Sequence, residues 1–170
     1  MAEAGAAGRV EAIYIGAEHG ELPHAVESVQ AIAGKGLEGN RYFDEGKPEK
    51  ELTLIEAEAL EALQAEHGIE LDGASSRRNV LTRGVRLNDL VGERFRVGEL
   101  ECRGIELCEP CLSLQSMTKP GIIDGLVHRA GLNAEILVGG ELRRGDRVEQ
   151  IEAGPGRPAG PQRGTPVRSR

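Results

Sequence analysis

Aromatic residues are scarce in this chain of 170 residues, and tryptophan is absent. The aromatic side chains are Tyr14, Tyr42, Phe43 and Phe95. A hydrophobic core must therefore consist mainly of leucine, isoleucine, valine and alanine. The scarcity also argues against a platform for single-stranded nucleic acid, because such platforms stack bases on exposed rings.

Long apolar runs are also missing. No stretch approaches the roughly 20 apolar residues that a membrane-spanning helix needs. The first ten residues lack the basic start and apolar stretch of a signal peptide. With 39% hydrophobic and 29% charged residues, the composition is that of one globular domain. We therefore expect a cytoplasmic protein with no membrane partner.

Positive charge is in deficit, because 21 basic residues stand against 28 acidic ones and the net charge is −7. Phosphate neutralisation drives DNA affinity, so we expect no nucleic-acid partner. Beyond Glu152 the chain carries arginine and no acid, and it is rich in glycine and proline. We expect a disordered leader at 1–8, one domain at 9–152 and a disordered basic tail at 153–170.

Short alternating segments predict a fold that is mainly β. The expected strands are residues 10–15, 25–32, 52–55, 78–83, 93–98, 100–107, 134–140 and 145–152. In the first strand, Val10, Ala12 and Tyr14 share one face. Strands do not alternate regularly with helices, which disfavours a doubly wound parallel sheet. The pattern instead favours a closed or nearly closed β-barrel with a few peripheral α-helices.

Helical periodicity is clear in one place, directly after the strand at 52–55. Thr53 and Glu56 have the spacing of a capping box, and Gly68 is placed to end the helix. Residues 112–129 predict short helical stretches broken at Pro120. Residues 34–50 are too polar for a core element and too long for a simple turn, so we expect a partly mobile loop.

Cysteine is limited to Cys102, Cys108 and Cys111, an odd number that argues against a disulfide framework. The C-x-x-C pair at 108–111 leaves four alternatives. It forms a structural zinc site with Cys102 and His128, or a redox pair, or the cysteines are simply buried, or Cys111 is a functional thiolate. The last is favoured because Cys111 follows a proline at a strand-to-helix junction, where a helix dipole lowers a thiol pKa.

Two basic motifs are candidates for binding an anion. Arg77, Arg78 and Asn79 precede a strand, and arginine presents a planar fork that matches phosphate. The stretch GLEGNRY at 36–42 permits a tight glycine loop, followed at once by Arg41. His128 is the histidine expected near Cys111.

In this order the motifs resemble the MOSC domain, the family named after the C-terminal domain of molybdenum cofactor sulfurase. The matching stretches are GLEGNRY at 36–42, LTLIEAEAL at 52–60, RRNVLTRGVRLNDLVGERFRVGE at 77–99, EPC at 109–111, HRAGL at 128–132 and GGELRRGDRV at 139–148. The resemblance spans about residues 9–150 and implies a β-barrel related to that of pyruvate kinase, in a stand-alone member of the family.

The resemblance implies binding of the molybdenum cofactor, a pterin dithiolene with a terminal phosphate, and no need for pyridoxal phosphate. In members that reduce N-hydroxylated compounds, the cysteine of the Pro-Cys step ligates molybdenum, and this role carries over to Cys111. The cofactor-binding candidates are Asn40, Arg41, Arg77, Arg78, Asn79 and His128. Where the family's loop reads Gly-Asp-Arg-His, this chain has Asn40 and Tyr42, which puts an acid–base role for the loop in doubt.

Three functions stay open at this point. The first is an oxidoreductase that reduces N-hydroxylated compounds and needs an external electron donor. The second is a carrier that hands persulfide sulfur or the cofactor to a partner enzyme. The third is a binding module for an anionic heterocycle without chemistry of its own. The first two use the same thiol, Cys111, so the sequence does not separate them.

Overall fold

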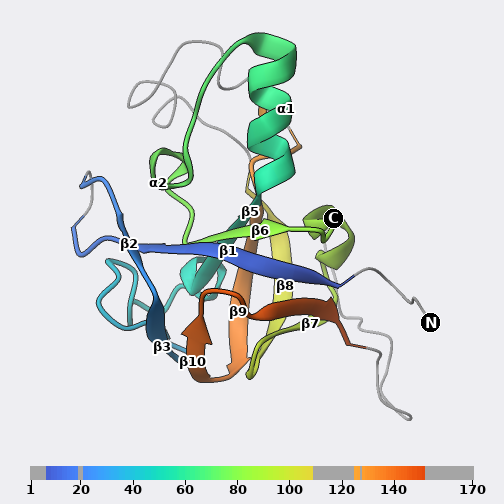
Figure 1. Ribbon diagram of the computed structural model, residues 1–170. Helices are drawn as coiled ribbons and strands as arrows, with labels where there is room; N and C mark the ends of the chain where they lie inside the picture. The colour runs from blue at the N-terminus through green and yellow to red at the C-terminus, as the bar shows by residue number, and fades with distance from the viewer. Residues whose placement is uncertain (1–6, 19–20, 109–124, 127, 152–170) are drawn as a thin grey trace.

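The computed structural model describes residues 7–18, 21–108, 125–126 and 128–151 (Figure 1). Within these ranges the strands are β1 Gly8–Ile15, β2 His24–Val26, β3 Ser28–Ile32, β4 Gly36–Leu37, β5 Leu52–Glu56, β6 Val80–Arg83, β7 Arg94–Val97, β8 Leu100–Leu107, β9 Leu132–Val138, β10 Gly140–Arg143 and β11 Arg147–Gln150. The helices are α1 Ala57–His67 and α2 Gly73–Ser76, with 3-10 turns η1 Pro48–Lys50 and η2 Leu87–Leu90. No helix in the described part of the chain has the length and apolarity to cross a bilayer.

Seven strands close into a barrel in the order β1-β11-β7-β8-β9-β5-β6, with β6 returning to β1. Neighbours are antiparallel except β5 and β6, which run parallel because α1 and α2 form the crossover between them. β2 continues the edge of β1 beyond its pairing with β11. Strands β10, β3 and β4 form a separate small sheet. The predicted fold class, a closed barrel that is mainly β, is confirmed.

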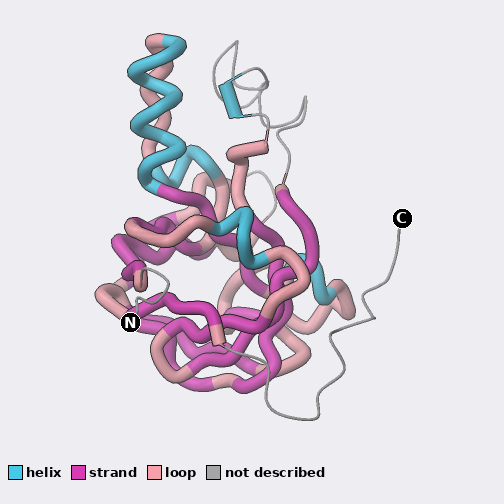
Figure 2. The backbone as a smooth tube through the Cα atoms, turned by 90° about the vertical axis from the view of Figure 1, so that its right-hand side faces the viewer, coloured by secondary structure: helices cyan, strands magenta, loops and turns pink. Residues whose placement is uncertain are grey.

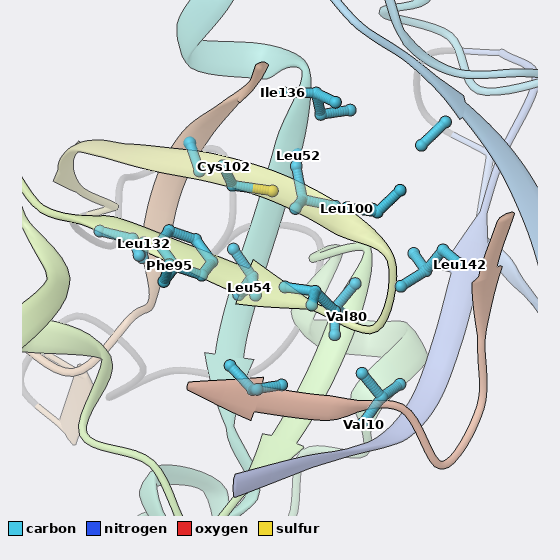
Figure 3. Packing of buried hydrophobic residues seen from close by; sticks show 14 of the residues in the cluster. Val10, Leu52, Leu54, Val80, Phe95, Leu100, Cys102, Leu132, Ile136 and Leu142 are labelled. Carbon is cyan, nitrogen blue, oxygen red and sulfur yellow. The ribbon is translucent and has the colours of Figure 1, made fainter. Parts of the chain in front are cut away.

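The barrel interior is filled by side chains that alternate inward along each strand. Phe95 on β7 is fully buried among aliphatic residues of the facing strands, among them Leu54, Val80 and Leu132 (Figure 3). Cys102 lies in the same cluster, opposite Phe95 in the β7–β8 ladder. The interior is therefore a packed core, and any ligand must bind outside it.

A second apolar cluster lies outside the barrel, where α1 packs its buried face. Leu60 and Leu63 of α1 meet Ile55, Cys108 and Leu126 there. Both views show α1 projecting beyond one end of the strands (Figures 1 and 2). The helix ends at Gly68, whose φ of 69° is left-handed, as predicted.

Several local predictions were wrong. Residues 25–32 form two strands in different sheets, with Glu27 between β2 and β3. Residues 34–50 contain β4 and η1, and Leu37 belongs to the core, although the mobility of the loop stays a prediction. β10 and α2 were not predicted. β1 begins at Gly8, inside the predicted leader. The predicted tail at 153–170 and most of the helical stretch at 112–129 lie outside the described residues.

Candidate functional site

The candidate site lies at the C-terminal end of β1, on the side where β2 and α2 are found in Figure 1. Gly16 follows this strand, and both its amide and its carbonyl form hydrogen bonds with the loop at 36–42. Its amide donates to Asn40 Oδ1 at 3.1 Å, and its carbonyl accepts from the Arg41 amide at 2.8 Å. Asn40 is buried, so its side chain fixes the glycine loop against the barrel. Arg41 is thereby placed beside the end of β1.

Asn79 fastens three segments together at the same end of the barrel. Its Nδ2 donates to the carbonyl of Tyr14 on β1 at 3.1 Å. Its Oδ1 accepts from both the amide and the hydroxyl of Thr53 on β5, at 3.2 and 3.1 Å. Because the side chain is buried and committed to these bonds, its role in the structure is to position Arg77 and Arg78.

Arg77 is one of three residues other than glycine with a left-handed backbone among the described residues, with a φ of 66°. It ends α2, and its side chain donates to the carbonyl of Glu21 at 2.6 Å. Burial lowers the pKa of this guanidinium, and the positive charge of Arg41 lowers it further. Arg41 and Arg77 therefore lie close enough to repel one another. The left-handed backbone of Arg77 is strained for a residue other than glycine, and strain of this kind is typical of functional sites.

Arginines of the described residues are mostly ion-paired, as expected in an acidic protein. Arg83, for example, contacts both Glu11 and Glu61. Within the described ranges, the arginines with no carboxylate partner are Arg41, Arg77, Arg78 and Arg96. Three of these four belong to the predicted site. Clustered cations without carboxylates are a binding surface for an anion.

Arg78 contacts a different segment from the one that Arg77 contacts, at another border of the site. Its Nε donates to the carbonyl of Ala130 at 2.8 Å. The next carbonyl, of Gly131, accepts from the amide of Cys108 at 2.7 Å. The segment matching HRAGL is thus fixed between β6 and the end of β8. His128 in this segment is exposed, has a φ of 61°, and accepts at its carbonyl from Asn88 at 3.0 Å.

Both tyrosines of the chain lie at this end of the barrel, although only Tyr42 was singled out from the sequence. Gly73 packs directly on Tyr14, since a Cβ there would meet its hydroxyl at 2.5 Å. Burial, followed by the charges of Asp72 and Glu11, raises the Tyr14 pKa. The Tyr42 ring lies 5.4 Å from the Arg41 guanidinium and 5.5 Å from the Lys50 ammonium. No motif in the sequence marked Lys50. The two tyrosines could have been found from the sequence, because aromatic residues are rare in this chain.

The described cysteines do not support the zinc alternative that includes Cys102. Cys102 is buried inside the barrel, and burial strongly raises its thiol pKa. Cys108 lies in the outer cluster, where its Sγ contacts Asn133 Oδ1 at 2.6 Å. Within the described ranges, no group of three or more His, Cys, Asp or Glu residues is arranged to hold a metal ion. Cys111 lies outside the described residues, so its place in the site stays a prediction.

A surface hollow of about 520 Å³ lies elsewhere, at the N-terminal half of β1. Its lining includes Arg9, Glu11, Glu27 and Arg144. Arg9 pairs with Glu11, and Arg144 pairs with Glu27. Because its arginines are already paired, this hollow offers a weaker anion site than the end of β1.

The closed barrel and the arginine cluster at the end of β1 define a small β-barrel protein with a surface site suited to an anion. The family model of the MOSC domain matches residues 42–149. The chain therefore belongs to the MOSC domain family, as its motifs predicted. This family is associated with the molybdenum cofactor.

Solved structures of the same fold come from several bacteria. YuaD of Bacillus subtilis superposes with a TM-score of 0.74 at 14% identity, covering 85% of this chain and 95% of YuaD. YiiM of Geobacillus stearothermophilus gives 0.70 at 15% identity, covering 88% of this chain and 77% of that one. YiiM of Escherichia coli gives 0.63 at 17%, covering 85% and 70%. No curated protein has a significantly similar sequence. At these identities the likeness shows the fold alone.

Proposed function

We propose that this protein binds the molybdenum cofactor at the end of β1, with the cofactor's phosphate held by Arg41 and Arg77. The observation that carries the proposal is that two arginines held at the same end of the barrel have no carboxylate partner among the described residues, and that the charge of Arg41 acts on Arg77. Two like charges held together are unfavourable unless an anion joins them. The planar forks of arginine suit the oxygen atoms of a phosphate.

The surrounding residues fit a phosphorylated heterocycle. Asn40 and Asn79 hold the strand ends so that the arginines have fixed positions. Arg78 stands at the border formed by residues 128–131, next to the end of β8. By the family resemblance, Cys111 is the molybdenum ligand, and a soft thiolate suits a metal that already holds dithiolene sulfurs. His128 lies on the same border as a further candidate contact.

When bound, the cofactor supplies metal-centred redox chemistry that no side chain provides. Reduction of N-hydroxylated compounds is the activity that the resemblance implies, with electrons from an external donor. The protein's own contribution would be to bind the phosphate through Arg41 and Arg77 and to orient the cofactor through the residues around them. Transfer of sulfur or cofactor to a partner enzyme is the alternative use of the same site.

Expression in a host that makes the cofactor tests the proposal. We expect purified protein to carry molybdenum and pterin, and R41Q and R77Q each to lower both contents at least about tenfold, since each removes a charged hydrogen-bond partner of the phosphate. R96Q is the matched control, because Arg96 is also unpaired within the described ranges but lies on β7. Equal loss in R96Q, or no loss in R41Q and R77Q, contradicts the proposal.

Activity separates the two uses of the site. Loaded protein with a chemical reductant should reduce an N-hydroxylated compound if it is an oxidoreductase, and C111S should abolish this reaction. Loaded protein that lacks this reaction but transfers pterin or sulfur to an acceptor enzyme would instead support the carrier.

A further inference from the structure

Tyr42 brings a third cation to the arginine pair. Its ring lies 5.4 Å from the Arg41 guanidinium and 5.5 Å from Lys50 Nζ, both within the range of cation–π attraction. Arg77 feels the charge of Arg41 and also the phenol of Tyr42. One ring therefore contacts both Arg41 and Lys50 at the end of the barrel, and the charge of Arg41 in turn acts on Arg77.

Lys50 has no carboxylate partner among the described residues, although its own loop is rich in acid. Lys35 of this loop does pair with Asp44, at 3.8 Å, which shows that ion pairs form there. Glu51, next to Lys50, is buried and accepts from the amide of Ile136 at 2.9 Å. Of the two acids that flank Lys50 in the sequence, Glu51 is thus turned to the barrel, and Glu49 forms no ion pair with the lysine within the described ranges. The half-buried Lys50 instead lies beside the Tyr42 ring.

The charge count exceeds what one phosphate needs. A phosphate monoester carries about −1.5 to −2 at neutral pH, which the Arg41–Arg77 pair balances. A third cation at the same ring leaves an excess of positive charge. A second phosphoryl group joined to the first would neutralise it, since a diphosphate carries more negative charge on a short, linked frame.

We propose that Lys50 and Tyr42 form an outer anion subsite beside Arg41 and Arg77, and that the natural ligand carries a diphosphate. This inference rests on the proposed function, in which the inner pair holds the cofactor's first phosphate. Tyr42 is the positioning residue, because its ring holds Lys50 next to Arg41. The diphosphate belongs either to a dinucleotide form of the pterin cofactor or to a free nucleoside diphosphate.

Calorimetric titration with inorganic phosphate and with pyrophosphate tests the subsite. We expect pyrophosphate to bind the wild type at least about tenfold more tightly than phosphate, the effect of one further charge-assisted contact. K50M should lose this preference while binding phosphate within about twofold of the wild type. K47M is the matched control, because Lys47 is also unpaired within the described ranges but is not in contact with the Tyr42 ring. It should leave both affinities unchanged.

Variants of Tyr42 separate its ring from its hydroxyl. Y42F keeps the cation–π surface and should retain the preference for pyrophosphate, whereas Y42L should lose it as K50M does. Thermal unfolding of each variant shows whether it is folded. Equal binding of the two anions by the wild type, or wild-type behaviour of K50M, overturns the subsite. Loss of phosphate binding in R77Q would still support the inner site, so the two proposals fail separately.

Analysis of the loaded protein identifies the source of the diphosphate. Mass spectrometry of the extracted pterin should show a diphosphate-linked nucleotide if the cofactor supplies it. A monophosphate pterin together with tight, Lys50-dependent binding of ADP would assign the subsite to a free nucleotide. A monophosphate pterin with no Lys50-dependent binding of ADP or pyrophosphate overturns the inference.

Discussion

Asparagine at position 79 shows how a residue of a binding motif can act without touching the ligand. The motif of two arginines and an asparagine suggested direct contact with a heterocycle. In the structure, both ends of the Asn79 amide are committed to Tyr14 and Thr53. The side chain therefore joins β1 to β5 and fixes the backbone from which Arg77 and Arg78 project. A contact of Asn79 with a ligand stays a prediction, while its hydrogen bonds to β1 and β5 are present in the structure.

Substitution of Asn79 by alanine should destabilise the protein by about 2–3 kcal/mol, because buried partners on two strands lose their hydrogen bonds. Urea unfolding measures this change. N88A is the matched control, since Asn88 is exposed and donates one bond, to the carbonyl of His128. It should cost less than about 1 kcal/mol. A loss in N79A no greater than in N88A would show that the network is dispensable.

Elements whose signals are local could be predicted from the sequence. The strands at 93–98 and 100–107 were predicted, and they form the antiparallel pair β7 and β8, because alternation acts over a few residues. The C-terminal end of α1 at Gly68 was predicted for the same reason. These features depend on neighbours in the sequence and need no knowledge of the rest of the fold.

Where distant segments decide the outcome, the sequence misled. Alternation placed Val10, Ala12 and Tyr14 on one face, yet a register shift between Val10 and Ala12 makes Val10 and Ile13 the buried pair. The capping box also failed. α1 begins at Ala57 without a side-chain cap, because Thr53 is a strand residue bonded to Asn79. Both errors come from partners on other strands.

Close packing of strand ends gives a prediction at the scale of the element. Gly131 directly precedes β9 and has a φ of 117°. A Cβ at this position would lie 2.0 Å from the carbonyl oxygen of Leu54 on β5. We expect G131A to destabilise the protein by about 3 kcal/mol or more, because backbone must move apart.

Gly145 provides the control for backbone conformation. Its φ is 94° but nothing lies within 4 Å of a Cβ at that position. G145A should therefore cost only the strain of a left-handed alanine, about 1 kcal/mol. Chemical denaturation of both variants separates the clash from the strain. Equal losses would contradict the close approach of Gly131 to β5.

The candidate site is a property of the whole molecule, because its parts come from segments far apart in the sequence. The glycine loop at 36–42, the arginine motif at 77–79 and residues 128–131 meet only once the barrel closes. From the sequence, Arg41, Arg77 and Arg78 could be predicted as candidates because motifs mark them. Lys50 could not, since a lysine in an acidic loop normally forms a solvated surface. Its significance comes from Tyr42, which the fold brings beside it.

The stability of the barrel should depend on pH through two groups of carboxyls that have opposite effects. Burial raises the pKa of Glu51 and of Glu56 above the ordinary value of 4.5. The folded protein then binds these protons more readily than the unfolded chain, so both groups lower stability as pH rises through the interval above 4.5. Hydrogen bonds from arginine lower the pKa of Glu61 and of Glu66, so their stabilisation is lost on acidification below 4.5.

The variant E51Q isolates the contribution of Glu51 to the pH dependence of stability. Glutamine can still accept the hydrogen bond of the Ile136 amide through Oε1, but it carries no charge into the barrel wall. We expect E51Q to be more stable than the wild type at pH 7, with the difference shrinking as pH falls toward 4.5, where Glu51 is itself protonated. Urea unfolding between pH 4 and pH 8 measures this, and E61Q should show the opposite sign at pH 7. A constant difference between E51Q and the wild type across this range would show that the Glu51 carboxyl does not titrate differently in the folded and unfolded states. The buried acid beside Lys50 would then hold the loop by its hydrogen bond alone.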